Sequence, residues 1–308
     1  MQRLRERIRV LADLPTTVLV TGETGTGKSE VARALHTISK RRHLPLTMVD
    51  CGAIASSLIE SELFGHEAGA FTGARSQRKG RLETVGKGTL FLDEVAELPM
   101  SLQSRLLRAM EDRTFERVGG STVRALSARV VAATNVPLDR AVREGRFRSD
   151  LFYRLDVVRL EVPPLRLRRE DIPELVDHGL VALCGRLGRK PPRPEGDFLR
   201  RLSLHDWPGN VRELRNVLER VLVHGVEHRL EAGHLDGALS DDRRTEARCS
   251  DSASVQGQWD SIESARIAAT LRESGGNVSR AARRLGLART SLRRRIEKYG
   301  LEGLMPRD

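Results

Sequence analysis

Residues Gly22-Glu23-Thr24-Gly25-Thr26-Gly27-Lys28-Ser29 form a glycine-rich segment in this chain of 308 residues. A β-branched apolar run, Thr17 to Thr21, precedes the segment, and a helical pattern follows it as far as about Ile38. A strand that enters a glycine loop and opens a helix is typical of phosphate binding, because the glycines let backbone N–H groups approach the anion and the helix N-terminus favours its charge. Lys28 is placed to reach the β- and γ-phosphates, and Ser29 to ligate Mg²⁺. We therefore predict that this loop binds a nucleoside triphosphate.

About sixty residues further on, Leu90-Phe91-Leu92-Asp93-Glu94 is an apolar strand that ends in two carboxylates. Asp93 can hold the magnesium ion through its waters, and Glu94 can orient and deprotonate the attacking water. An acidic strand end by itself is usually a solvated loop start. After a phosphate-binding loop at this spacing, the pattern favours nucleotide hydrolysis.

The order of the remaining segments predicts an α/β fold. A helical pattern from Met100 to Glu111 separates the apolar run at Leu90 from another at Arg129 to Ala133. Strands that alternate with helices favour a parallel sheet covered on both faces. After Pro163-Pro164 the pattern is helical as far as Leu239. We expect an α/β domain over 1–164, a helical subdomain over 165–239, a flexible linker over 240–258 and an all-α domain over 259–308.

Charge and cysteine usage narrow the class of protein. The net charge is +11 and the isoelectric point is about 10.4, which favours a polyanionic partner. Cys51, Cys184 and Cys249 have no paired spacing, so neither a disulfide framework nor a zinc site is indicated. Every apolar run falls short of the roughly 18 residues that a membrane-spanning helix requires. We expect a soluble cytoplasmic protein without a membrane partner.

Three further segments resemble the AAA+ ATPases. They are Val130-Val131-Ala132-Ala133-Thr134-Asn135, Phe147-Arg148-Ser149-Asp150-Leu151-Phe152-Tyr153-Arg154 and Trp207-Pro208-Gly209-Asn210-Val211-Arg212-Glu213-Leu214. The resemblance implies that Asn135, or the neighbouring Thr134, senses the γ-phosphate. It also implies that Arg148 and Arg154 reach the nucleotide of an adjacent subunit, and that Arg212 faces the nucleotide from a helical lid. An arginine supplied by a neighbour stabilises transition-state charge, so such a site is complete only in an oligomer.

The segment Gly69-Ala70-Phe71-Thr72-Gly73-Ala74 makes the resemblance more specific. Its composition alone would suit a glycine-rich surface turn with Phe71 folded inward. The segment is, however, identical to the loop by which bacterial enhancer-binding proteins of the NtrC type engage sigma-54. The chain resembles this family over about Met1 to Leu239. The resemblance includes the segment Phe115-Glu116-Arg117-Val118-Gly119-Gly120 of this chain. The resemblance implies a ring, usually a hexamer, whose loop moves with the nucleotide state to remodel the closed sigma-54 RNA polymerase promoter complex.

One position departs from the family pattern. The family often has Asn before the cysteine, where this chain has Asp50-Cys51. That Asn pairs with the catalytic glutamate and couples loop position to hydrolysis. An aspartate near Glu94 could instead repel it or share a proton with it.

The C-terminal segment is strongly basic. Residues 266–308 contain ten arginines and one lysine against four carboxylates. Apolar residues at helical spacing mark three short helices, with Gly286 at a turn, as in a helix-turn-helix that reads the major groove of double-stranded DNA. The segment resembles the Fis-type module of many enhancer-binding proteins. The candidate DNA contacts are Arg289, Thr290, Ser291, Arg293 and Arg294.

The expected function is that of an ATP-driven activator that binds DNA upstream of sigma-54 promoters. A second possibility is an AAA+ remodeller of another protein or of DNA, against which the intact Gly69 to Ala74 loop argues. A third is a DNA-binding regulator that does not use ATP, against which Lys28, Asp93 and Glu94 argue. The regulatory domain that commonly precedes this module is not apparent before Gln2.

Overall fold

The computed structural model describes residues 1–223 and 228–239 and, further on, the single positions 270, 271, 274, 277, 278, 281, 282 and 292. The chain divides into two compact units, Met1–Leu235 and Asp236–Asp308. The boundary expected between residues 164 and 165 therefore lies inside the first unit.

The first unit is built around a five-stranded parallel sheet with the strand order β2-β5-β8-β1-β9. Its strands are β1 (Val18–Thr21), β2 (Leu46–Asp50), β5 (Thr89–Asp93), β8 (Arg129–Thr134) and β9 (Val158–Glu161). The three strands expected from apolar runs are the three central ones, because a strand buried on both faces is apolar along its whole length. The edge strands β2 and β9 are only partly buried and carry no such run.

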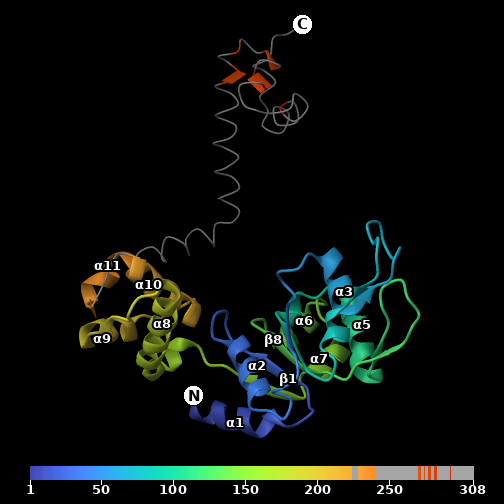
Figure 1. Cartoon of the computed structure of the whole chain (residues 1–308), viewed down its shortest axis with the longest axis horizontal. Helices are drawn as coiled ribbons and strands as arrows, with labels where there is room; N and C mark the ends of the chain where they lie inside the picture. Colours follow the sequence, from blue (N-terminus) through green and yellow to red (C-terminus); the bar gives the residue numbers. More distant parts are fainter. Residues whose placement is uncertain are drawn as a thin grey trace. The chain divides into compact units, whose positions relative to one another are not determined.

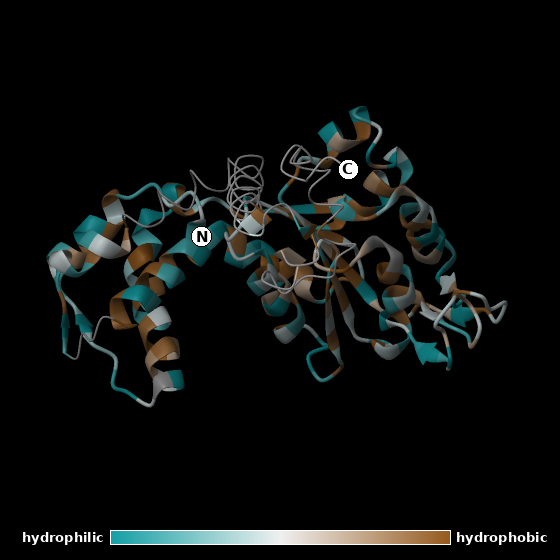
Figure 2. Ribbon diagram, turned by 90° about the horizontal axis from the view of Figure 1, so that it is seen from above, coloured by the Kyte–Doolittle hydropathy of each residue, from teal (hydrophilic) through white to brown (hydrophobic). Residues whose placement is uncertain are grey.

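Helices cover both faces of this sheet. Leu19, Leu90 and Leu92 point into one core cluster with α3 (Ser56–Phe64), α5 (Met100–Asp112), α6 (Leu138–Arg143) and α7 (Ser149–Leu155). Val18, Val20 and Phe91 point the other way, into a cluster with α1 (Gln2–Ala12) and α2 (Lys28–Thr37). The alternation follows from the two-residue period of a strand. Figures 1 and 2 show the two helical layers and the hydrophobic sheet between them.

Two hairpins interrupt the layer on the α3 side. β3 (Gly65–His66) pairs with β4 (Arg78–Lys79), and β6 (Thr114–Phe115) pairs with β7 (Arg124–Ala125). The first hairpin encloses residues Gly69 to Ala74. Two short elements complete this region, α4 (Arg81–Thr84) and the 3₁₀ turn η1 (Val95–Glu97).

The lid follows β9 and consists mainly of helices. Its elements are η2 (Leu165–Leu167), η3 (Arg169–Asp171), α8 (Ile172–Leu187), α9 (Gly196–Leu204), α10 (Asn210–Val223), η4 (Ala232–His234) and α11 (Leu235–Ala238). Trp207 is fully buried, and its indole N–H donates to the Leu202 carbonyl at 2.8 Å. A parallel pair of two-residue strands, β10 (Arg193–Pro194) and β11 (Arg229–Leu230), interrupts the expected helical pattern. Such short strands are too brief to show a period of their own.

Among the helices that the structure describes, none has the length and apolar character needed to cross a bilayer.

Candidate functional site

The phosphate-binding loop connects β1 to α2, as the sequence predicts. Gly22, Gly25 and Gly27 all have positive φ angles, of 154°, 78° and 98°. A Cβ atom at Gly25 would lie 2.3 Å from the carbonyl oxygen of Gly209, so only glycine fits there. The loop therefore depends on glycine both for its backbone path and for its close contact with the lid.

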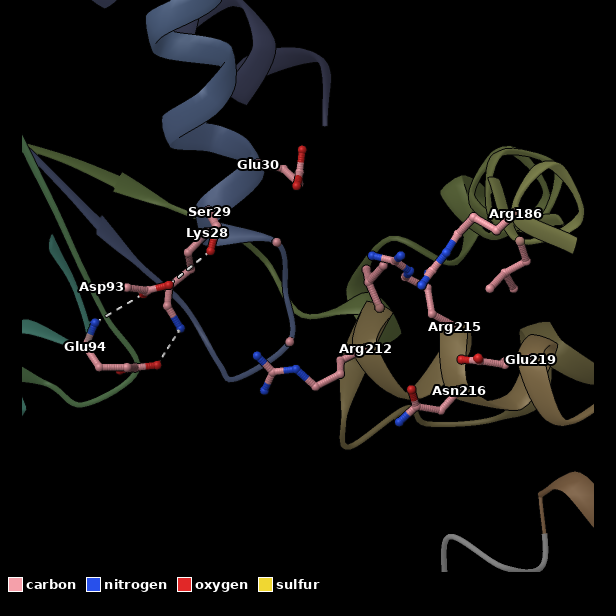
Figure 3. Close-up of a pocket in the computed structure, with 14 residues that line it drawn as sticks. Lys28, Ser29, Glu30, Asp93, Glu94, Arg186, Arg212, Arg215, Asn216 and Glu219 are labelled. Atoms are coloured by element: carbon pink, nitrogen blue, oxygen red, sulfur yellow. Dashed lines mark hydrogen bonds and ion pairs between the residues drawn. The ribbon is translucent and has the colours of Figure 1, made fainter. Parts of the chain in front are cut away.

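Lys28 is the first residue of α2, and its side chain is almost fully buried against the loop. Its ammonium group donates to the carbonyl oxygens of Gly22 and Glu23 at 3.1 and 3.4 Å. It also lies 3.5 Å from Oε1 of Glu94. The cation therefore stands between the loop and the acidic end of β5 (Figure 3).

The end of β5 supplies two carboxylates with different surroundings. Asp93 Oδ2 accepts a hydrogen bond of 3.0 Å from the Ser29 hydroxyl. Glu94 has a positive φ of 49°, and its Oε2 accepts a bond of 3.2 Å from the backbone N–H of Asn135. The Ser29 and Asp93 oxygens are hard ligands that suit Mg²⁺, whereas Glu94 stays free of Ser29 and turns towards Lys28.

Asn135, at the end of β8, joins this arrangement from the next strand. Its side-chain amide donates to the Thr24 hydroxyl at 2.8 Å, so it touches both Glu94 and the phosphate-binding loop. Thr134 is buried, and its hydroxyl bonds locally with Val136. Of the two expected sensor positions, Asn135 is the one that meets the other site residues.

Lys28, Ser29, Asp93 and Glu94 line a cavity of about 310 Å³ between the loop, β5 and the lid helices α8 and α10, whereas Asn135 does not line it. Arg212, which the resemblance predicts to face the nucleotide from the lid, is one of the lining residues. Arg186, Arg215, Asn216 and Glu219 line it as well, and Figure 3 shows these lid side chains opposite Lys28 and Asp93. The sequence does not predict these last four residues, because spacing along α8 and α10 does not show which helix faces meet the loop.

Glu23 belongs to the loop but does not line this cavity. Arg166 and Asn210 donate hydrogen bonds to its carboxylate, at 2.8 and 3.1 Å respectively. Those bonds, the Arg166 ones first, lower the pKa of Glu23 from 4.5 to about 2. The side chain therefore stays ionised and points towards the lid connection.

Arg148 and Arg154 lie at α7 and take no part in lining the cavity of their own chain. Arg148 is 40 % exposed and makes a bidentate pair with Asp150, at 3.1 and 2.7 Å. Arg154 donates to the Met110 carbonyl at 2.9 Å.

The segment Gly69 to Ala74 forms the tip of the β3–β4 hairpin. The Gly69 N–H donates to the Ala74 carbonyl at 2.8 Å, and both Gly69 and Gly73 have positive φ angles. Thr72 is exposed, and Phe71 is 41 % exposed with its ring 5.0 Å from that of His66. The tip therefore presents a partly exposed aromatic group, and Phe71 is not folded into the core.

A network of ion pairs connects the base of this hairpin to the rest of the unit. Arg117 is buried and pairs with Glu67 at 3.1 Å and with Glu83 at 2.8 Å. The Glu67 N–H donates to the Val118 carbonyl at 3.0 Å. Through these bonds the β6–β7 hairpin is attached to the base of the Gly69–Ala74 loop.

Asp50, which departs from the family pattern, lies beside Asp93 in the β2–β5 register. Its Oδ1 accepts hydrogen bonds from the N–H groups of Gly52 and Ala53 at 3.0 and 3.1 Å. Within the described residues Asp50 makes no hydrogen bond to Glu94. The nearby carboxylates of Asp50, Asp93 and Glu94 add to burial in raising the pKa of the Cys51 thiol to about 12.

The expected DNA contacts Arg289, Thr290, Ser291, Arg293 and Arg294 lie outside the described residues. Of the apolar positions in that segment, Leu271, Ala281, Ala282 and Leu292 are described and buried.

The sheet order, the phosphate-binding loop and the helical lid together define a P-loop ATPase fold of the AAA+ type. The loop follows β1, Asp93 ends β5 with Glu94 directly after it, and Asn135 directly follows β8, which lies between β5 and β1 in the sheet. All of these groups meet at the carboxyl ends of parallel strands, where ligands bind in open α/β sheets.

Comparison with known proteins narrows the class. Family models match at residues 1–161 (sigma-54 interaction domain), 166–252 (AAA+ ATPase lid domain) and 260–299 (bacterial regulatory protein, Fis family). The chain is 43% identical to the C4-dicarboxylate transport transcriptional regulatory protein DctD of Pseudomonas aeruginosa, over 98% of this chain and 63% of that protein. It is 42% identical to the Nif-specific regulatory protein of Azotobacter vinelandii, over 98% of this chain and 58% of that protein.

A solved structure of a similar protein covers nearly the whole chain as well. The crystal structure of NtrX from Brucella abortus in complex with ATP has a TM-score of 0.70 and 35% identity, and covers 97% of this chain and 67% of that one. This chain therefore belongs to the family of sigma-54-dependent transcriptional activators that carry a Fis-type helix-turn-helix. It spans about half to two thirds of the length of its relatives.

Proposed function

We propose that this protein hydrolyses ATP and uses the energy to activate transcription by sigma-54 RNA polymerase. The observation that carries the proposal is the set of contacts around the cavity: Lys28 with Glu94, Ser29 with Asp93, and Asn135 with both Glu94 and Thr24. The ATP complex of the NtrX relative supports ATP as the nucleotide.

In the proposed mechanism Lys28 binds the β- and γ-phosphates, and Ser29 and Asp93 hold Mg²⁺. Bound there, the ion would neutralise charge on the phosphate oxygens. When Lys28 turns from Glu94 to the phosphates, the Glu94 carboxylate becomes free to accept the proton of the attacking water. Asn135 then senses the γ-phosphate, because its side-chain amide bonds to Thr24 in the loop while its backbone N–H bonds to Glu94. Arg212 acts from the lid.

The remaining contributions come from other copies and other domains. Arg148 and Arg154 act on the nucleotide of an adjacent subunit, so the working form is a ring, proposed to be a hexamer. The Gly69–Ala74 loop carries Phe71 and Thr72 to sigma-54. The helix-turn-helix binds upstream DNA through Arg289, Thr290, Ser291, Arg293 and Arg294. We propose the division 1–164, 165–239, 240–258 and 259–308; the matched ranges 1–161, 166–252 and 260–299 begin and end near the boundaries at 164 and 259, and the lid match extends into 240–258.

Transcription in vitro from a sigma-54 promoter, with ATP or a non-hydrolysable analogue, tests this function. Lys28→Ala should abolish ATP turnover because the phosphates lose their cation. Glu94→Gln should lower turnover by about 10² to 10⁴, the contribution of a general base. Thr72→Ala should keep hydrolysis and lose transcription, and it serves as the control that separates the two activities.

Each alternative function has its own outcome. Hydrolysis without transcription would indicate an AAA+ remodeller with another target. Full activation by Lys28→Ala would indicate a DNA-binding regulator that does not use ATP. Either result would contradict the proposal.

A further inference from the structure

Asn210 is a buried polar residue that the proposed mechanism does not use. It is the first residue of α10, its exposed fraction is 0 %, and its φ is +55°. Asparagine adopts this left-handed backbone conformation more readily than most residues. A buried amide is costly unless its donors and acceptor find partners, so its contacts are informative.

The Asn210 side chain joins three segments of the first unit. Oδ1 accepts a hydrogen bond of 2.7 Å from the Leu165 N–H, in the connection between β9 and the lid. Nδ2 donates to Glu23 Oε2 and to the Thr24 carbonyl, both at 3.1 Å in the phosphate-binding loop. A third contact, to the Pro208 carbonyl at 3.3 Å, stays within the lid.

Neighbouring groups strengthen the same junction. Arg166 holds the Glu23 carboxylate with two hydrogen bonds, of 2.8 and 2.5 Å. The carbonyl of Gly25 accepts N–H groups from Val211 and Arg212 at 3.0 and 3.3 Å. The first turn of α10 therefore lies directly on the phosphate-binding loop, and Arg212 belongs to that turn.

We propose that Asn210 and Glu23 are positioning residues that hold the start of α10 against the phosphate-binding loop, so that the Arg212 side chain faces the bound nucleotide. Neither residue lines the cavity, so both act through Arg212. The proposal rests on the proposed nucleotide site. It also accounts for a carboxylate inside a loop that binds phosphate, because Glu23 serves the lid.

The substitution Asn210→Asp keeps the shape of the side chain and replaces its hydrogen-bond donor with an acceptor. An oxygen would replace the amide nitrogen 3.1 Å from both the Glu23 carboxylate and the Thr24 carbonyl, so two attractive contacts would become repulsive. A hydrogen bond to a charged group contributes more free energy than one between neutral groups. We therefore expect the dissociation constant of a fluorescent ATP analogue to rise about ten- to a hundredfold. Leu204→Asp, which adds the same charge at an exposed lid position, should bind as the wild type does.

A double-substitution cycle with Arg212→Ala tests the route. If Asn210 acts through Arg212, Asn210→Asp combined with Arg212→Ala should bind the analogue no more weakly than Arg212→Ala alone. Additive losses, or wild-type affinity in Asn210→Asp, would overturn the proposal. Thermal unfolding with and without the analogue identifies a merely structural role, in which the melting temperature of Asn210→Asp falls while its affinity is unchanged.

Two further variants keep the result interpretable. Glu23→Gln combined with Asn210→Asp exchanges donor and acceptor, and should recover part of the lost affinity. No recovery would count against direct pairing of the two side chains. Lys28→Ala tests the nucleotide site itself. If Lys28→Ala does not bind the ATP analogue and Asn210→Asp binds it as the wild type does, only the positioning role is overturned. Wild-type binding in Lys28→Ala overturns the proposed site as well.

Discussion

Glu23 shows how one side chain in a loop can serve a distant part of the fold. Its neighbours in sequence are phosphate-binding residues, yet its partners are Arg166 and Asn210. The low pKa of about 2 means that the folded protein holds the ionised form more tightly than an unfolded chain does. Ionised Glu23 therefore contributes to stability above the ordinary pKa of 4.5, and this contribution is lost as the pH falls through about 2.

Arg166→Gln should reduce this pH dependence, since Arg166 is the main cause of the low pKa. Between about pH 6 and about pH 3 the wild type should lose more free energy of unfolding than Arg166→Gln. Denaturant titrations at the two pH values measure the difference. Arg169→Gln is the matched control, because Arg169 pairs with the largely exposed Asp206, and its pH dependence should equal that of the wild type. Equal losses in all three proteins would contradict the assignment.

The β3–β4 and β6–β7 hairpins act on one another through a close backbone contact. Gly119 has a φ of +75°, and a Cβ atom there would lie 2.7 Å from the Cβ of Ala70. The same region contains the buried Arg117 and its two carboxylate partners. The position of the Gly69–Ala74 loop therefore depends on the second hairpin as well as on its own turn.

Gly119→Ala should displace Ala70 and impair transcription activation while ATP hydrolysis continues, because no residue of either hairpin lines the cavity. The left-handed backbone alone costs about 1–2 kcal/mol for a residue with a Cβ atom. Gly145→Ala supplies the control: Gly145 has a φ of +68° with open space around it. Transcription and ATPase assays on both variants test this prediction. Equal activation by Gly119→Ala and Gly145→Ala would show that the contact between Gly119 and Ala70 does not affect transcription activation.

The whole molecule is expected to work as an oligomer, because Arg148 and Arg154 do not reach the cavity of their own chain. Tyr153, between them, is 74 % exposed, as a residue at a subunit contact would be in an isolated chain. A purified protein that hydrolysed ATP fully as a monomer at every concentration would contradict this arrangement.

Mixing two inactive variants tests the shared site. Lys28→Ala retains Arg148, and Arg148→Ala retains Lys28, so neither protein alone should hydrolyse ATP. In a ring formed from equal amounts of both, about one quarter of the interfaces would combine an intact loop with an intact arginine. ATPase measurements on the mixture should therefore show recovered turnover. A mixture as inactive as its components would show that Arg148 does not act between subunits.

Much of this protein is predictable from the order of its residues. The phosphate-binding loop, the carboxylates of β5 and the three central strands follow from local patterns, because glycine spacing and continuous apolar runs reflect backbone geometry and burial directly. The family resemblance adds Arg212 and the Gly69–Ala74 loop. For these features, neighbours in sequence supply most of the physical constraint.

Other features arise only when segments far apart in the chain come together. The edge strands β2 and β9, the cavity-lining Arg186 and Arg215, and the Glu23–Asn210 contact have no local pattern of their own. Nothing around Glu23 in the sequence predicts a partner 187 positions away. Hydrogen bonds between distant segments depend on how the lid packs against the loop, and that packing results from many side chains acting together.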